Sequence, residues 1–352
     1  MTAGDDDATV VLRRSPPPRR PRPLIAAVAI AAVAVMAVLG VLVWPRGHPG
    51  APAAAPQAST SGPIWGVQPA PEASVAAQRV APAPPAAAAP RFTVAAADER
   101  TILATQATGL VVFRYADDPH VLVLSFPSLL AQGRMLNRVA AFVEKAGMPH
   151  DRILSEAELD AIMTRTHDSE ATFYLGHDYR AADLARFFAT AARNGVPLRP
   201  EETVLRALLE QEGMLAPGAV GAVISIPPDG TQPPIDDAAR ATILHHELSH
   251  GLYFTDPGYA AFVRVFWDSV LTDAQRAGFR RFLGGEGYDT GIDDLMVNET
   301  QAYLMHTQDP RFFRPALAGL TDAEANALRR RFVRDMPASW LKTATVARLG
   351  GG

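Results

Sequence analysis

Residues 243–251 read ILHHELSHG, and this stretch determines the expected fold and chemistry of the chain. It places His246 and His250 four residues apart, with Glu247 directly after the first histidine. On an α-helix, two side chains at this spacing project from one face about one turn apart, so both imidazoles reach a single metal ion. Glu247 then lies beside the open coordination position. Two nitrogen ligands, a carboxylate that takes a proton from water and an open position are what a zinc hydrolase needs.

The residues around this motif favour a helix. Asp236 and Asp237 suit a helix start, and no proline follows them before Pro257. The helix has an apolar face to bury, made of Ile243, Leu244, Leu248 and Leu252. The alternative is an ordinary amphipathic helix that carries two histidines and a glutamate on its polar side. His245 points about 100° away from His246, so we expect a packed or supporting histidine there and not a ligand.

Composition limits the other possible functions. The chain has 352 residues, of which 48% are hydrophobic, so there is ample material for a large core. A net charge of -4 gives no support for nucleic-acid binding. The sequence contains 0 cysteines, which excludes disulfides, thiolate ligands and cysteine nucleophiles. Any metal must therefore be held by His, Asp or Glu.

The N-terminal region predicts a membrane anchor. Residues 1–23 are polar and arginine-rich and form an expected disordered cytoplasmic tail, and residues 24–44 are a continuous apolar stretch that ends in Trp44. About 20 apolar residues cross a bilayer as a helix, and the arginines before the stretch place the N-terminus in the cytoplasm. We therefore expect a single-pass protein of the inner (cytoplasmic) membrane, with its main domain periplasmic or otherwise extracytoplasmic. A cleaved secretory signal is the alternative, because small residues at 51–55 suit a peptidase.

Residues 45–91 are rich in proline and alanine, which predicts an extended linker, and a folded domain is expected over residues 92–352. Its apolar runs predict neighbouring strands at 110–115 and 121–126, a possible third at 171–175 and an edge strand at 220–226. An edge strand beside a metal site could pair with an extended peptide. Helices are expected at 129–145, 155–164, 181–193, 201–212, 259–270, 272–285 and 292–305, and from 321 onward. The expected fold class is α+β, mostly helical, with a small mixed or antiparallel sheet and an active-site helix.

A tetrahedral zinc site with two histidines and a water needs a third protein ligand. Glu299 is the predicted ligand, because its helix lies downstream and can cross the first one to present a carboxylate to the same ion. The long segment between the two motifs leaves room for an intervening helical pair.

The two motifs together, HELSH at 246–250 and NETQAY at 298–303, resemble the gluzincin branch of the zincin metallopeptidases. This resemblance implies a zincin-like domain in which His246, His250 and Glu299 bind zinc and Glu247 is the general base. The gap between the motifs is longer than in thermolysin-like enzymes, so the resemblance assigns no subfamily.

Asp256 is the rival third ligand. It follows His250 by six residues, where metzincin-like enzymes place a further ligand, although Tyr253 stands where that pattern has its turn glycine. Asp256 also suits a helix N-cap before Pro257.

The expected function is that of a membrane-anchored zinc metallopeptidase acting on a peptide or protein. Glu247 takes the proton of the attacking water and passes it to the leaving amine. Tyr303, one turn beyond Glu299, is the first candidate for oxyanion donor, Tyr253 is the second and His306 is a weaker one. Two other functions remain open: a catalytically silent binding or scaffold protein of the cell envelope, and a zinc hydrolase that acts on an ester or a non-peptide amide. The sequence assigns no oligomeric state.

Overall fold

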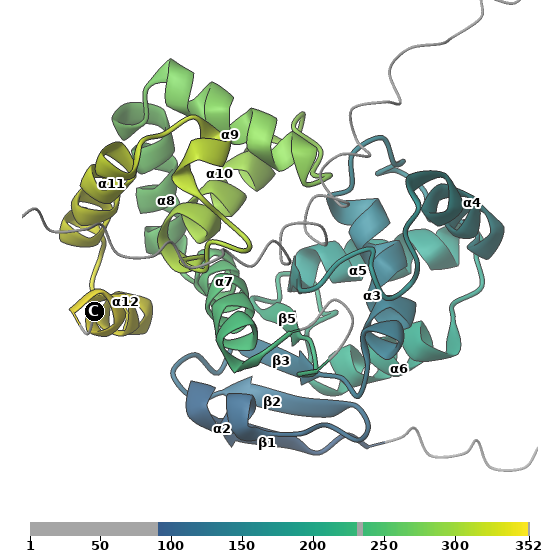
Figure 1. The fold of residues 1–352 in the computed structure, drawn as a ribbon. Coiled ribbons are helices and arrows are strands. Elements are labelled where there is room, and N and C mark those ends of the chain that lie inside the picture. Colours follow the sequence, from purple (N-terminus) through teal and green to yellow (C-terminus); the bar gives the residue numbers. More distant parts are fainter. Residues whose placement is uncertain (1–90, 231–234, 351–352) are drawn as a thin grey trace, which may run out of the picture. The chain divides into compact units, whose positions relative to one another are not determined.

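The computed structural model describes residues 91–230 and 235–350, all of which belong to one compact unit. The fold is mostly helical with one small mixed sheet, which confirms the α+β prediction (Figure 1). The strands are β1 (Val94–Ala97), β2 (Val111–Tyr115), β3 (Val121–Ser125), β4 (His177–Arg180) and β5 (Ala222–Ile226). The helices are α2 (Glu99–Ala104), α3 (Leu129–Val143), α4 (Glu156–Thr166), α5 (Ala181–Arg193), α6 (Pro200–Gln211), α7 (Asp237–Thr255), α8 (Pro257–Val265), η1 (Phe266–Val270), α9 (Asp273–Gly285), α10 (Asp293–Gln301), η2 (Ala302–His306), η3 (Pro315–Ala318), α11 (Asp322–Asp335) and α12 (Trp340–Gly350).

The sheet has the strand order β1-β2-β3-β5-β4. Strands β2 and β3 form the expected neighbouring pair and are antiparallel, with Phe113 opposite Val123. Strand β5 runs parallel to β3 and antiparallel to β4, so it lies inside the sheet. The prediction of an edge strand at 220–226 was therefore wrong. The glycine before β5 and the prolines after it lie outside the paired residues, and all five residues of the strand are buried.

The possible strand at 171–175 was also wrong. The backbone N–H groups of Thr172 and Phe173 both donate to the carbonyl of Ser169, which makes a tight turn. Phe173 is buried by this turn in the core formed by α3, α5 and α6. The actual strand, β4, begins at His177 and is the edge strand beside α7. Its sequence is HDYR, which lacks an apolar alternation, so burial by its neighbours overrides a weak local preference.

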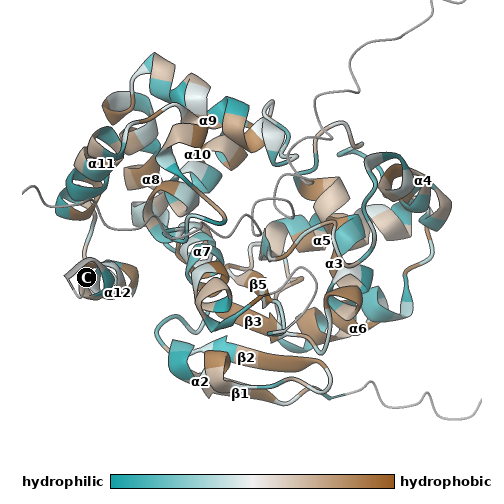
Figure 2. Ribbon diagram, viewed as in Figure 1, coloured by the Kyte–Doolittle hydropathy of each residue, from teal (hydrophilic) through white to brown (hydrophobic). Residues whose placement is uncertain are grey.

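Helix α7 lies between the sheet and the C-terminal helices (Figure 1). Asp236 caps its start as predicted, since its side chain accepts a hydrogen bond from the N–H of Ala239. Leu244 and Leu248 pack on β3 and β5, whose residues form the apolar band of the sheet in Figure 2. Leu252 and the following residues pack on α8 and α10. The helix is therefore buried on both sides, and its polar residues must find partners in the interior.

The predicted cytoplasmic tail, transmembrane segment and most of the linker lie outside the described residues. Within the described part of the chain, no helix is both long and apolar enough to cross a membrane.

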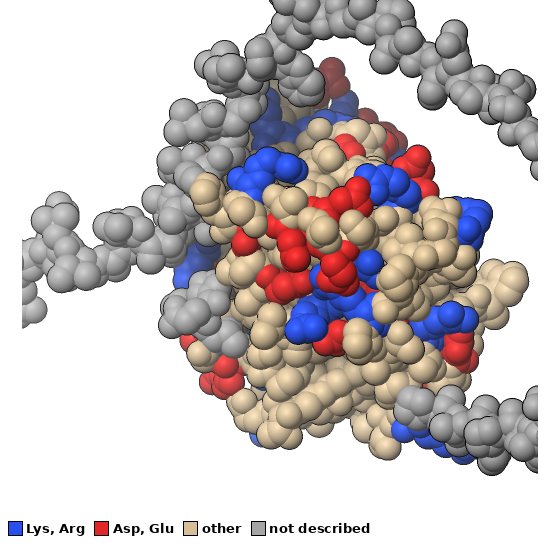
Figure 3. All heavy atoms as spheres, turned by 90° about the vertical axis from the view of Figure 1, so that its right-hand side faces the viewer, with Lys and Arg blue, Asp and Glu red and all other residues tan. Residues whose placement is uncertain are grey.

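The face of the molecule in Figure 3 carries acidic and basic side chains next to one another. Ion pairs between elements of the described chain include Arg134 with Glu201 and Arg199 with Glu156. Pairs of this kind neutralise one another, so this face offers no extended basic surface to a polyanion.

Candidate metal centre

Two helices bring the predicted ligands together. Helix α7 supplies His246 and His250, and α10 supplies Glu299. The two carboxylate oxygens of Glu299 lie 3.6 Å from His246 Nε2 and 3.6 Å from His250 Nε2, respectively. The ligand atoms of the three residues all lie within 4.8 Å of one another, and all three residues are buried. This cluster is close enough to hold a metal ion.

A buried hydrogen-bond network fixes the crossing of the two helices. The hydroxyl of Ser249 on α7 donates to the carbonyl of His246 at 2.7 Å and accepts from Gln301 Nε2 of α10 at 3.0 Å. Tyr259 on α8 donates its hydroxyl hydrogen to Gln301 Oε1 at 2.8 Å. Because both polar ends of Gln301 are engaged, the register of α10 on α7 is specified by geometry and not by apolar packing alone.

The ring of His246 is held in one tautomer. The hydroxyl of Thr307 donates to the carbonyl of Ala302 at 3.1 Å, so its oxygen accepts from His246 Nδ1 at 2.7 Å. A proton on Nδ1 leaves the lone pair on Nε2, which is the nitrogen that faces Glu299. Outer-shell hydrogen bonds of this type orient the histidine ligands of metal sites.

His250 has an acidic neighbour on β4. Its Nδ1 lies 3.5 Å from Oδ2 of Asp178, and its ring stacks on Phe254 with centroids 6.4 Å apart. A carboxylate near Nδ1 favours the tautomer with its proton on that nitrogen, which again leaves Nε2 free to bind a metal.

Glu247 lies beside the cluster without being one of its three ligands. The residue is buried, and its Oε2 has no hydrogen-bond partner in the described part of the chain. Burial, and then repulsion from Glu299 and Glu144, raises the pKa of this carboxyl well above its ordinary value. Gly176 makes room for the carboxylate, because a Cβ atom at position 176 would lie only 2.0 Å from Glu247 Oε1.

The donor set fits a metal ion. Both ring nitrogens of His250 and both carboxylate oxygens of Glu299 are buried without a hydrogen-bond partner among the described residues. Buried polar atoms without partners cost free energy, and a bound cation would satisfy His250 Nε2 and an oxygen of Glu299. Burial lowers the pKa of His246 to about 3 and that of His250 to about 4, so both imidazoles are neutral near pH 7, as ligands must be. Two nitrogens and one carboxylate oxygen are a typical set for catalytic zinc.

The structure separates the remaining candidates from this cluster. Asp256 caps α8, and its Oδ1 accepts from the N–H groups of Gly258 and Tyr259. It belongs to no group of potential metal ligands in the described ranges. His245 points to another side of α7 and pairs with Glu99.

The three candidate oxyanion donors lie in different surroundings. The ring of Tyr303 contacts that of His246, with centroids 4.7 Å apart, and the residue is only partly buried. Tyr253 donates its hydroxyl hydrogen to Asp294 Oδ1 at 2.7 Å, so that phenol is already engaged. His306 is buried, and burial lowers its pKa well below the ordinary value. Tyr303 and His306 lie on η2, a π-helical turn that continues α10 and that the sequence did not reveal.

Sequence reasoning missed two acidic residues at this centre. Glu144, after the end of α3, and Asp178 on β4 both lie with Glu299 in a group whose ligand atoms are within 4.8 Å of one another. Both are buried. Neither belongs to a recognisable motif, and no local pattern in the sequence could have found them.

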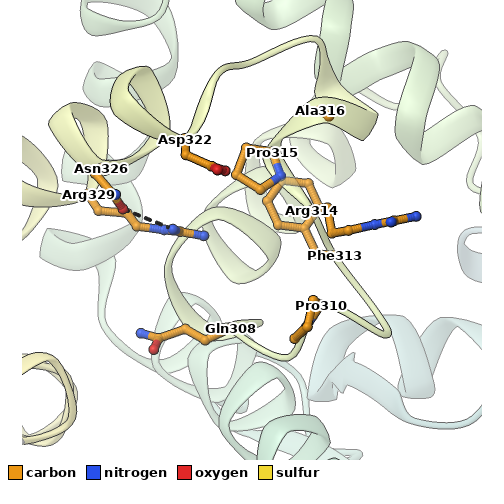
Figure 4. A pocket seen from close by; sticks show the side chains of 9 residues that line it. All are labelled: Gln308, Pro310, Phe313, Arg314, Pro315, Ala316, Asp322, Asn326 and Arg329. Atoms are coloured by element: carbon orange, nitrogen blue, oxygen red, sulfur yellow. Dashed lines mark hydrogen bonds between the residues drawn. The ribbon is translucent and has the colours of Figure 1, made fainter. Parts of the chain in front are cut away.

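A separate cavity of about 530 Å³ lies next to the segment after η2 (Figure 4). Arg329 spans part of its wall, donating to the carbonyl of Leu304 at 2.8 Å and to Asn326 Oδ1 at 3.3 Å. The lining residues are Gln308, Pro310, Phe313, Arg314, Pro315, Ala316, Asp322, Asn326 and Arg329. None of them is a ligand of the metal centre.

Comparison of the chain with protein-family models, with curated proteins and with solved structures found no match. The function of the centre is therefore inferred from its own geometry and chemistry.

Proposed function

We propose that this protein is a zinc-dependent metallopeptidase of the gluzincin type, anchored in the cytoplasmic membrane by residues 24–44 with its catalytic domain outside. The observation that carries the proposal is the placement of one buried carboxylate, that of Glu299, opposite the Nε2 atoms of both histidines of the motif. Glu247 next to His246 adds the base that hydrolysis needs.

His246, His250 and Glu299 would hold the ion. Bound there, zinc supplies Lewis acidity, which lowers the pKa of a water molecule and polarises the carbonyl of the scissile bond. Thr307 and Asp178 keep the two imidazoles oriented with Nε2 toward the ion.

Glu247 moves the proton. Its buried Oε2 has no partner among the described residues, so it is free to accept a proton from the attacking water and deliver it to the leaving amine. Burial, and then repulsion from Glu299 and Glu144, raises the pKa of this carboxyl, which makes it a stronger proton acceptor than an exposed glutamate. Tyr303, whose ring lies against His246, is the proposed donor to the oxyanion.

The test combines metal content with one isosteric substitution. Wild type should contain one zinc per chain and cleave members of a peptide library in a chelator-sensitive manner. Glu247→Gln should keep the zinc and lose cleavage, whereas Asp256→Asn, the rival ligand, should keep both. Wild type with bound zinc and no chelator-sensitive cleavage of any peptide would favour the binding or scaffold function. Cleavage restricted to esters would favour a non-peptidase hydrolase.

A further inference from the structure

The metal centre contains more buried acid than one zinc site uses. Glu144, Asp178, Glu247 and Glu299 all have low exposed fractions, of 3%, 7%, 5% and 0%. One zinc ion takes Glu299 as its ligand, and Glu247 has its own task as base. Glu144 and Asp178 remain, on the side of Glu299 that faces β4 and the end of α3.

Nearby cations do not neutralise this excess. The ammonium of Lys145 lies over the rings of Phe173 and Tyr174, 4.2 Å from each centroid, and donates to the carbonyl of Phe173 at 3.4 Å. Arg180 follows Asp178 by two residues, but its Nη2 donates to Asp294 on α10 at 2.6 Å. Ionised carboxylates in an interior of low dielectric are very costly unless a positive charge lies among them.

Unpartnered polar groups at the same place point to a missing ligand. Glu299 has two buried oxygens without a hydrogen-bond partner in the described ranges, and one bond to zinc accounts for only one of them. The hydroxyl of Tyr179 on β4 is likewise buried and unpartnered among those residues. Glu299 on α10 and Asp178 on β4 meet Glu144 from different elements.

The geometry suits a hard divalent cation. The ligand oxygens of Glu144, Asp178 and Glu299 all lie within 4.8 Å of one another. Oxygens on opposite sides of an ion with bonds of about 2.3 Å are about 4.6 Å apart, so the three can share one ion after small adjustments. An all-oxygen set suits Mg²⁺, Mn²⁺ or Ca²⁺, unlike the nitrogen-rich set of the two histidines.

We propose that Glu144, Asp178 and Glu299 bind a second divalent metal ion of the hard, oxygen-preferring class, next to the zinc site. Glu299 would hold both ions, one with each carboxylate oxygen, which suits the separation of about 3.5–4 Å found in two-metal sites. The second ion neutralises the acids that the first leaves unpaired and holds Asp178 in place against His250. This inference rests on the metal-binding part of the proposed function.

The experiment measures the two ions separately on the full-length chain. The protein is stripped with a chelator, loaded with one equivalent of zinc and then titrated with Mn²⁺, while electron paramagnetic resonance follows free Mn²⁺. Wild type should retain one zinc and bind one Mn²⁺. Glu144→Gln should retain the zinc and bind Mn²⁺ about 100-fold more weakly, because glutamine has nearly the same shape as glutamate but lacks the negative charge.

Two further variants make the result specific. Asp178→Asn should also lose Mn²⁺ binding, which provides a second test if Glu144→Gln folds poorly. Asp183→Asn is the matched control, since Asp183 lies near enough to influence Glu144 but belongs to no metal group in the described residues, and it should bind both ions.

Two results would overturn the second site while leaving the proposed function intact. One is zinc binding without Mn²⁺ binding in wild type, and the other is unchanged Mn²⁺ affinity in both Glu144→Gln and Asp178→Asn. A wild-type chain that binds neither ion would instead remove the metallopeptidase proposal as well.

Discussion

Gly176→Ala should disable the proposed general base without removing the metal. The Cβ atom that alanine adds would lie 2.0 Å from Oε1 and 2.8 Å from the carboxyl carbon of Glu247, and 3.2 Å from Cγ2 of Ile243. Real Cβ atoms essentially never approach other atoms closer than 3.0 Å, so the carboxylate must retreat by at least about 1 Å. The three nearest atoms belong to Glu247 and Ile243, so the proposed ligands His246, His250 and Glu299 are not displaced directly.

The expected cost follows from that displacement. A misplacement of about 1 Å in a catalytic group costs on the order of 100-fold in rate, which corresponds to about 2.7 kcal/mol of transition-state stabilisation. We therefore expect kcat/KM on the best peptide of the library to fall about 100-fold. Zinc content, measured by mass spectrometry, should stay at the wild-type value, and thermal unfolding should show a folded protein.

Gly109→Ala is the matched control, because a Cβ atom at position 109 meets nothing within 4 Å. In a Glu247→Gln background, Gly176→Ala should cause no further loss, since the base has already been removed. The reasoning is refuted if folded, zinc-loaded Gly176→Ala cleaves the peptide as fast as Gly109→Ala.

Three further outcomes are expected. Thr307→Val removes the acceptor of His246 Nδ1, so zinc affinity measured by competition with a chelator should fall about 10- to 100-fold, while Thr307→Ser should bind as wild type does. Burial lowers the pKa of His177 from 6.5 to about 3, so protonation of the unfolded chain reduces stability as the pH falls from 6.5 to about 3. Relative to His177→Gln, wild type should lose about 1.4 kcal/mol per pH unit between pH 6.5 and about 3 in denaturant titrations, and a constant difference over this range would contradict the prediction. Chelation should lower the unfolding temperature of wild type. If zinc was present at 1,000 times its Kd, its removal should reduce the free energy of unfolding by about 4 kcal/mol. Unchanged calorimetric scans would argue against a metal that binds only the folded state.

Much of the fold was predictable because local patterns determine it. The β-branched runs at 110–115 and 121–126 predicted β2 and β3, and the capping residues Ser155, Thr272 and Thr321 open the helices that they were expected to open. Strand β1 escaped prediction because VAAA has little intrinsic preference for a strand and forms one by pairing with β2. The position of β5 inside the sheet depends on β4, which has no strand-like pattern of its own.

Local sequence patterns likewise predicted some residues of the candidate site and not others. His246, Glu247 and His250 lie within one helical turn, so their mutual placement follows from helix geometry alone. The prediction of Glu299 needed only one further assumption, that a second helix crosses the first. Asp178 and Glu144 reach the centre through the packing of β4 and α3 on α7 and α10, which is tertiary information that a single sequence does not display.

The buried acids make folding and metal binding depend on each other. Burial, followed by repulsion from Glu299, raises the pKa of both Glu144 and Asp178 well above their ordinary values. A carboxyl whose pKa is raised on folding binds more protons in the folded state, so its contribution to stability declines as the pH rises above its unfolded value of about 4. Bound cations replace those protons and remove the penalty. These two carboxyls therefore contribute least to stability when the chain is metal-free at neutral or alkaline pH, and bound cations would restore that contribution.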